Sequence, residues 1–434
     1  MSHEAALRAA VPEDVAELMG QLRAARFAAY VVGGAVRDTL AGRAPSDWDL
    51  ATDATPDQLR NAFPDAQYEN RFGTVGIPTS AGVREVTTFR ADGPSSDARR
   101  PDVITFLSAI EGDLARRDFT INAMAFGAPS GAHGDLVASG SLIDPFGGAA
   151  DLAAGLLRAV GDPSERFRED ALRMLRAARF ATRFNLTIEP ATAAAIRRDV
   201  ALVATLSGER IGAEVEGILA AENPAPGLHT LNDLGLTAQI APELHAAWVT
   251  ELPARVAAVG RAGSPDAPDP IGRLAELLAV ITDDAVVEKI LTAWRRPRAT
   301  LHAVAALRAA DRSAAAAERG EIDAAAYRIA TAAQSGDPRD AARQLRRRIA
   351  SGRATPAAAT LLVLCERADE QQIPALVGDL AADGGEIIAA INEQPGAWVK
   401  PLLEELLQEV AHGRVANRRD AIVAAAKQLY EKKR

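Results

Sequence analysis

The sequence predicts an α+β N-terminal domain, consisting of a small mixed sheet with helices, followed by an all-α remainder. Two observations carry this prediction. Short runs of β-branched residues are concentrated in the first third of the 434 residues, and from about residue 151 alanine-rich segments with leucines three and four apart continue to the C-terminus. Because alanine favours helices, the second part is expected to be helical. A chain of this length with 48% hydrophobic residues is expected to form roughly two to four domains.

The N-terminal elements follow from periodicity and from glycine and proline breaks. A strand at residues 30–32 ends at Gly33 and Gly34, and the run at 83–89 is the richest in β-branched residues. The other expected elements are helices at 13–26, 35–40 and 56–63 and strands at 48–50 and 74–77. Breaks rich in proline and glycine at 223–227, 263–270 and 394–396 divide the helical part.

Composition narrows the class of protein. The net charge of -9 argues against a protein that coats nucleic acid indiscriminately, although arginine clusters at 99–100, 116–117, 295–298 and 343–348 are suited to phosphate contacts. The run at 343–348 is a candidate contact with a nucleic-acid backbone. No apolar stretch long enough to span a membrane and no signal peptide is present, so we expect a cytoplasmic protein without membrane contact. The single cysteine, Cys365, follows an apolar run and is expected in the core.

Asp47 and Asp49 are the first candidate site. Side chains alternate along a strand, so both carboxylates would project from one face while Trp48 points to the other. Paired carboxylates with substrate phosphate oxygens are ligands that Mg²⁺ prefers, which suggests a metal-dependent nucleotidyl transfer site. An isolated Asp-x-Asp is also compatible with a solvated turn.

Residues around this pair favour the metal site. Gly33 and Gly34 end a strand and open a helix, which brings backbone N–H groups and the positive helix end close to a triphosphate. Arg37, one turn further, is expected to reach the same phosphates. Glu85 is the candidate third carboxylate, to hold the metal on the nucleophile side or to accept the proton from the attacking hydroxyl. Its alternative is an exposed strand glutamate.

A helical pattern at residues 168–180 carries a second candidate group. Asp170 and Arg173 are three apart and are expected to be neighbours on one helix, as are Arg173 and Arg176, and Arg176 and Arg179. Ordinary ion pairing within the helix explains them. The alternative is base selection, because cytosine and adenine both present an amino donor beside an unprotonated ring nitrogen. A carboxylate beside a guanidinium matches these bases and mismatches uracil and guanine.

The order of these motifs resembles a known family. Gly-Gly-Ala-Val-Arg-Asp (33–38), Asp-Trp-Asp (47–49), Glu-Val-Thr-Thr-Phe-Arg (85–90), Arg-Arg-Asp-Phe-Thr-Ile-Asn-Ala (116–123), Ile-Asp-Pro-Phe-Gly-Gly (143–148) and Arg-Phe-Arg-Glu-Asp-Ala-Leu-Arg (166–173) are similar to the bacterial class II tRNA nucleotidyltransferases, the CCA-adding enzymes. The likeness continues through 207–219 and into 396–413, so it covers nearly the whole chain. The segment at 90–101 resembles the flexible loop that the family uses to switch from C to A addition.

The resemblance implies a fold, a reaction and residue roles. It implies a nucleotidyltransferase head (1–150), a helical neck (151–220) that recognises the base, a helical body (221–305) and a helical tail (306–434) that binds tRNA. The reaction implied is addition of C, C and A to the tRNA 3′ end from CTP and ATP, by a two-metal mechanism with release of pyrophosphate. Carried over by position, the implied roles are Mg²⁺ binding by Asp47 and Asp49, phosphate binding by Gly34 and Arg37, and binding of the incoming CTP or ATP by Arg117, Asp170, Arg173, Arg176 and Arg179.

Other functions remain open from the sequence. An A-adding tRNA nucleotidyltransferase or a poly(A) polymerase shares the head and neck motifs, and the C-terminal resemblance favours the CCA-adding enzyme over the polymerase. A non-catalytic RNA-binding protein that kept the fold is a further alternative, against which the intact Asp47, Asp49 and Arg37 argue. The sequence does not predict the oligomeric state.

Overall fold

The computed structural model describes residues 2–68, 73–92, 104–131, 140–261, 263–264, 267–350 and 354–433. The chain divides into two compact units, Met1–Ala246 and Ala247–Arg434. Most of the sequence-predicted loop at 90–101 lies outside the described residues.

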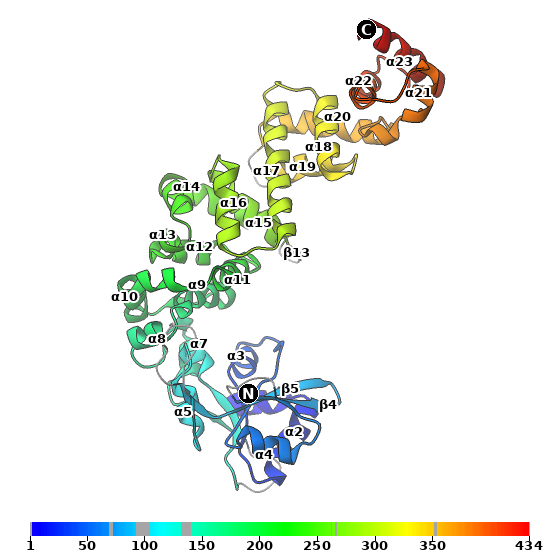
Figure 1. The fold of residues 1–434 in the computed structure, drawn as a ribbon. Coiled ribbons are helices and arrows are strands. Elements are labelled where there is room, and N and C mark those ends of the chain that lie inside the picture. Colours follow the sequence, from blue (N-terminus) through cyan, green and yellow to red (C-terminus); the bar gives the residue numbers. More distant parts are fainter. Residues whose placement is uncertain are drawn as a thin grey trace. The chain divides into compact units, whose positions relative to one another are not determined.

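The first half of the first unit is the α+β domain that the sequence predicts (Figure 1). Its helices are α1 (His3–Ala10), α2 (Glu13–Ala24), α3 (Gly34–Leu40), α4 (Pro56–Ala62), α5 (Ile110–Ala115) and α7 (Gly148–Ala153). Its strands are β1 (Ala29–Val32), β2 (Leu50–Thr52), β3 (Gln67–Tyr68), β4 (Thr74–Thr79), β5 (Gly82–Thr88), β6 (Arg90–Asp92), β7 (Ile104–Phe106), β8 (Ala125–Ala128) and β9 (Ser141–Ile143).

Seven of these strands form one mixed sheet in the order β3-β4-β5-β2-β1-β8-β9. The pairing of β2 with β5 is parallel and the others are antiparallel. Strand β1 has apolar residues on both faces because both faces are covered. Val31 belongs to a core that includes Leu18 of α2, Val36 of α3 and Leu59 of α4, whereas Tyr30 belongs to the core on the opposite face, with Leu114 of α5. Strands β6 and β7 form a separate hairpin.

Helices complete the first unit. They are α8 (Pro163–Glu169), α9 (Leu172–Phe184), α10 (Pro190–Asp199), α11 (Gly208–Leu219), α12 (Ala225–Asp233) and α13 (Leu236–Ile240), with the short parallel pair β10 (Leu156–Leu157) and β11 (Thr187–Ile188). Helix α12 packs tightly on this group, since a Cβ at Gly227 would overlap Thr182 of α9 and Ile218 of α11. The compact unit therefore extends beyond the break predicted at 223–227.

The second unit is helical apart from the two-residue pair β12 (Gly263–Ser264) and β13 (Ala267–Pro268). Its helices are α14 (Pro242–Arg261, which begins in the first unit), α15 (Pro270–Leu277), α16 (Asp284–Ala293), α17 (Arg298–Glu318), α18 (Ala324–Ser335), α19 (Asp340–Ala350), α20 (Ala357–Glu370), α21 (Gly384–Ile391), α22 (Val399–Ala411) and α23 (Arg419–Lys433). Helix α17 runs without interruption through the boundary predicted at 305/306. Cys365 is buried with Tyr327 and Leu345 in the core of α17 to α20, as predicted.

Candidate active site

Asp47 and Asp49 lie in extended chain immediately before β2. The Asp49 carbonyl accepts a hydrogen bond from the Val32 N–H at 3.0 Å, which continues the β1–β2 pairing. Trp48 and Leu50 are buried in the same core, whereas Asp47 and Asp49 are exposed. The alternation expected from the sequence therefore puts both carboxylates on the face opposite Trp48, although the strand itself begins two residues later than expected.

The Asp49 carboxylate has a distinctive electrostatic environment. It makes no hydrogen bond or ion pair with any residue in the described ranges. Partial enclosure by the protein raises its pKa, nearby Asp47 raises it further, and Arg117 acts in the opposite direction. Two carboxylates that repel each other, one of them without a donor, are stabilised by a bound cation.

Glu85 lies on the strand next to this pair. The parallel register pairs Leu50 with Val86 and Ala51 with Thr87, so the next step back places Glu85 beside Asp49. Val86 is buried with Leu50, and Glu85 is exposed on the other face, which is the face of Asp49. In the described part of the chain, however, no three acidic, histidine or cysteine side chains come close enough to hold a metal together.

The turn before α3 provides a close approach for a ligand. Gly33 precedes α3 with φ 63° and ψ -111°, a conformation that residues with a Cβ rarely adopt. A Cβ at Gly33 would overlap Nη1 of Arg117. The Nη2 of Arg117 donates to Asp113 at 3.2 Å, while its buried Nε makes no hydrogen bond to a described residue. Its Nη1 donates to the Asn122 carbonyl at 3.4 Å, and the guanidinium thus lies against the Gly33 turn and acts electrostatically on Asp49.

Arg37 is buried close to the glycine turn, where a Cβ at Gly34 would lie 3.7 Å from its Nη2. Its side chain is 6% exposed and pairs with Asp38 at 2.6 Å. Its Nη1 donates to Asn122 Oδ1 at 2.5 Å, and the guanidinium lies over the rings of Phe180 and Phe184 at 5.2 and 4.4 Å. Burial lowers its pKa and Asp38 opposes this effect. With its guanidinium enclosed on these sides, Arg37 joins α3 to α9.

The helix expected across residues 168–180 is interrupted at Asp170. Helix α8 ends at Glu169 and α9 begins at Leu172, and Asp170 has extended backbone angles (φ -151°, ψ 104°). Its carboxylate accepts from the Leu172 N–H at 3.0 Å and caps the start of α9. The expectation that Asp170 and Arg173 are neighbours on one helix was wrong, because this capping bond competes with helix continuation.

Asp170 and Arg173 each pair with another residue. Asp170 accepts from Arg210 of α11 at 2.7 Å, and one nitrogen of Arg210 is buried without a hydrogen bond to a described residue. Arg173 pairs with Glu169 at 2.7 Å and donates to the Arg116 carbonyl at 2.8 Å. The donor and acceptor that the sequence grouped are therefore held separately, and Arg210 is a residue that sequence reasoning missed.

Arg176 and Arg179 follow Arg173 at helical spacing on α9. Arg176 pairs with Asp118 at 2.7 Å, and Arg179 pairs with Glu214 of α11 at 2.6 Å. Their guanidinium groups lie 5.0 and 4.9 Å from the ring centre of Phe180. Each arginine therefore has an acidic partner through its Nε atom.

Asp118 is a second residue to which the sequence assigned no role. It accepts from Arg176 and from the Asn122 amide at 2.9 Å, and Asn122 in turn accepts from Arg37. Burial alone would raise the pKa of Asp118, but Arg176 and Asn122 outweigh it and lower the pKa to about 2. Asp118 and Asn122 thus connect α9 to the helix after the glycine turn. The motif at 116–123 contains both, and its spacing alone does not predict these partners.

The residues present fit a divalent metal ion, which the family implies. Asp47 and Asp49 supply the hard oxygen donors, and Asp49 has no competing donor among the described residues. Because Mg²⁺ is commonly held by one or two carboxylates together with substrate phosphates, a third protein ligand is not required.

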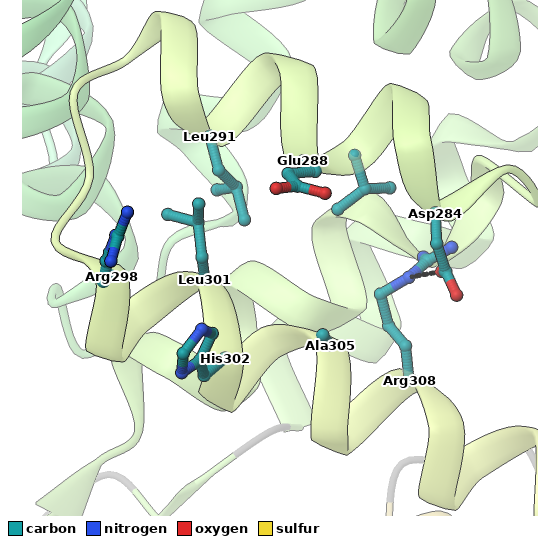
Figure 2. A pocket seen from close by; sticks show the side chains of 9 residues that line it. Asp284, Glu288, Leu291, Arg298, Leu301, His302, Ala305 and Arg308 are labelled. Carbon is teal, nitrogen blue, oxygen red and sulfur yellow. Dashed lines mark hydrogen bonds and ion pairs between the residues drawn. The ribbon is translucent and has the colours of Figure 1, made fainter.

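The second unit contains a cavity of about 430 Å³ between α16 and α17 (Figure 2). Its apolar lining includes Leu291 and Leu301, with Arg298 and His302 on α17 and Glu288 on α16. The cavity contains none of the residues predicted for catalysis.

A mixed sheet with two adjacent carboxylates, a glycine turn and an arginine near them are the features expected of a nucleotidyltransferase. Three family models match the chain: the poly A polymerase head domain at residues 29–158, the probable RNA and SrmB-binding site of polymerase A at 185–248, and the putative tRNA nucleotidyltransferase domain 2 at 273–426.

Similar proteins define the family further. A CCA-adding enzyme of Geobacillus kaustophilus is 32% identical over 95% of this chain and 96% of its own, and that of Geobacillus thermodenitrificans is 34% identical over 94% of both. A solved structure of the Bacillus stearothermophilus CCA-adding enzyme in complex with CTP has a TM-score of 0.76 and 28% identity, over 97% of this chain and 98% of that one. The chain belongs to the CCA-adding enzymes of the tRNA nucleotidyltransferase/poly(A) polymerase family. The family and enzyme class predicted from the sequence are confirmed. Among the described helices, none is long and apolar enough to cross a membrane.

Proposed function

We propose that this enzyme adds C, C and A to the 3′ end of tRNA from CTP and ATP, releasing pyrophosphate. The observation that carries the proposal is the convergence of Asp47, Asp49, the Gly33 turn and Arg117, supported by full-length similarity to CCA-adding enzymes. An A-adding enzyme is the alternative, and the names of the relatives favour CCA addition. A cytoplasmic location follows as an expectation for an enzyme of tRNA.

Within this proposal, Asp47 and Asp49 hold Mg²⁺. A metal ion held there would supply Lewis-acid activation of the tRNA 3′-hydroxyl and neutralise charge on the triphosphate. Gly34 presents the N-terminus of α3 to the phosphates, and the partly exposed Arg117 guanidinium provides positive charge beside that turn. Glu85, beside Asp49 in the sheet, accepts the proton of the attacking hydroxyl or supports the metal.

Arg37 is assigned an indirect role in phosphate binding. Arg37 is held by a buried ion pair with Asp38 and by a hydrogen bond to Asn122. These contacts suit a residue that positions the glycine turn better than one that binds phosphate directly. The turn and Arg37 are on the same short helix, so moving the guanidinium would move the N–H groups that face the ligand.

Base selection is assigned to Asp170 with Arg173. Arg210 donates to one oxygen of Asp170 at 2.7 Å, and a carboxylate only accepts hydrogen bonds, which suits the amino groups of cytosine and adenine. Arg173 leaves its ion pair with Glu169, whose side chain is 41% exposed, and donates a hydrogen bond to the ring nitrogen of the base. Arg176 and Arg179 extend the basic face of α9 toward the same nucleotide.

Ion pairs within the protein argue against the arginines at 343–348 as the contact with the tRNA backbone. Arg343 pairs with Asp337 and Asp340 at 2.7 and 2.9 Å, Arg346 with Glu366 at 2.6 Å, and Arg348 with Glu318 at 2.8 Å. Arg295 and Arg298, at the turn between α16 and α17, are exposed and have no ion pair with a described residue. We assign the phosphate contact to this pair of arginines.

The experiment uses tRNAs that lack CCA, carry C, or carry CC, each with single NTPs and Mg²⁺. Ordered addition of C, C and A supports the proposal, and addition of A alone to the CC-ending tRNA would move the enzyme to the A-adding class. Asp47→Ala and Asp49→Ala are each expected to abolish incorporation while tRNA binding persists. Substantial residual activity in either variant would contradict the metal assignment.

A further inference from the structure

Asp113, on α5, is a buried carboxylate shared by two arginines. Its side chain is 2% exposed. The Oδ1 atom accepts from Arg116 Nε at 3.0 Å and Nη2 at 2.9 Å, and Oδ2 accepts from Arg117 Nη2 at 3.2 Å. The N–H of Arg90, where β6 begins, also points at Oδ1 at 3.4 Å. The Asp113 side chain therefore contacts the first residue of the β6–β7 hairpin and both arginines.

Each arginine leads to a different part of the proposed site. Arg117 lies against Gly33 and acts electrostatically on Asp49. The backbone carbonyl of Arg116 accepts from Arg173 Nη2 at 2.8 Å. Asp113 thus connects the triphosphate side of the site with the side that selects the base.

A buried acid with arginine partners is often only a structural ion pair. Arg117 differs from a fully buried structural arginine, because its side chain keeps 21% exposure and lies against the Gly33 turn. Asp113 holds Nη2 of that guanidinium, and the Asn122 carbonyl accepts from Nη1 at 3.4 Å. Burial raises the pKa of Asp113, but Arg116 and Arg117 outweigh it and lower the pKa overall, so the carboxylate stays charged at neutral pH.

We propose that Asp113 is a positioning residue for nucleotidyl transfer: it holds the Arg117 guanidinium at the Gly33 turn. This inference rests on the proposed function. It assigns Asp113 no contact with substrate, and it predicts that nucleotide affinity depends on Asp113 only while Arg117 is present.

The test measures KM for CTP and ATP, kcat and tRNA affinity in Asp113→Asn. Asparagine keeps the shape, removes the charge and turns an amide N–H toward a guanidinium. Losing a hydrogen bond to a charged group is expected to raise KM for both nucleotides about 10- to 100-fold, with tRNA affinity unchanged. The double variant D113N/R117Q should be no worse than R117Q alone, because Asp113 acts through Arg117.

The matched control is Asp14→Asn. Asp14 is also a buried carboxylate in the first unit, paired with Arg84 at 2.7 Å, and it touches no predicted site residue. Equal KM increases in D14N and D113N, or additive effects of D113N and R117Q, would reduce Asp113 to a structural ion pair and overturn the inference. If D113N is not folded by its thermal melt, Asp113→Glu, which keeps the charge, supplies the same cycle with R117Q. Wild-type enzyme that fails to add nucleotides would instead refute the proposed function.

Discussion

The assignment of the tRNA contact gives a quantitative prediction. Replacing Arg295 and Arg298 with glutamine removes two exposed guanidinium groups that have no acidic partner among the described residues. If each contacts one phosphate, the slope of log K against log salt concentration should become shallower by about 0.7 to 0.9 per arginine, or about 1.4 to 1.8 in total. Because fourfold more salt then costs the variant less, the advantage of the wild type should shrink about tenfold between 50 and 200 mM salt.

The control removes a paired arginine without changing net charge. In R346Q/E366Q both partners of the 2.6 Å ion pair become neutral. The slope should match that of the wild type, because a guanidinium that is neutralised inside the protein releases no counterion when tRNA binds. Fluorescence anisotropy with labelled tRNA at four salt concentrations provides the measurement. The assignment would be refuted if R346Q/E366Q had a shallower slope than the wild type while the slope of R295Q/R298Q was unchanged. Residues 343–348 would then be the contact.

Three further predictions concern the first unit. Arg210→Gln should remove the 2.7 Å ion pair that holds the Asp170 carboxylate in place and raise UTP and GTP misincorporation about 5- to 30-fold, roughly 1 to 2 kcal/mol of discrimination. Unchanged selectivity in competition assays would argue against a role for the pair. Asp118→Asn should have a lower free energy of unfolding than the wild type at pH 6. This difference should shrink by about 2 kcal/mol as the pH falls through 4 toward 2, because a carboxylate with a lowered pKa stabilises the fold only above that range. Urea unfolding at each pH measures the difference, and a value that does not change with pH contradicts the prediction. Gly33→Ala should lose nucleotide binding, since the new Cβ overlaps the Arg117 guanidinium and φ is positive; isothermal titration with CTP that shows wild-type affinity would exclude the close approach.

Local rules were enough for the carboxylate pair. The two-residue period of extended chain puts Asp47 and Asp49 on one face whether or not a strand has begun, and the buried Trp48 fixes which face that is. The same period, with β5 beside β2, put Glu85 next to Asp49.

Other features depend on partners far away in the chain. Arg37 turns inward because Phe180 and Phe184, more than a hundred residues later, cover its guanidinium. The pair of Asp170 with Arg210 joins residues that no short-range pattern relates. Strand β8 escaped prediction because Ala125–Ala128 contains no β-branched residue; Gly127 is required there because a Cβ would overlap the Ala29 carbonyl.

The interruption at Asp170 has a consequence for how one pocket can serve two nucleotides. Inside a continuous helix the backbone angles of such a residue would be helical, and the helix would set the distance of its carboxylate from a bound ring. Asp170 stands between two helices with extended angles, while its N–H donates to the Arg166 carbonyl at 3.3 Å and its carbonyl accepts from the Arg173 N–H at 3.1 Å. A rotation about that residue would change the reach of its oxygens within the limits of these two hydrogen bonds, and a pyrimidine and the larger purine require different reaches. In the base-selecting role proposed for Asp170, the joint between α8 and α9 would let two bases of unequal size meet the same acceptor.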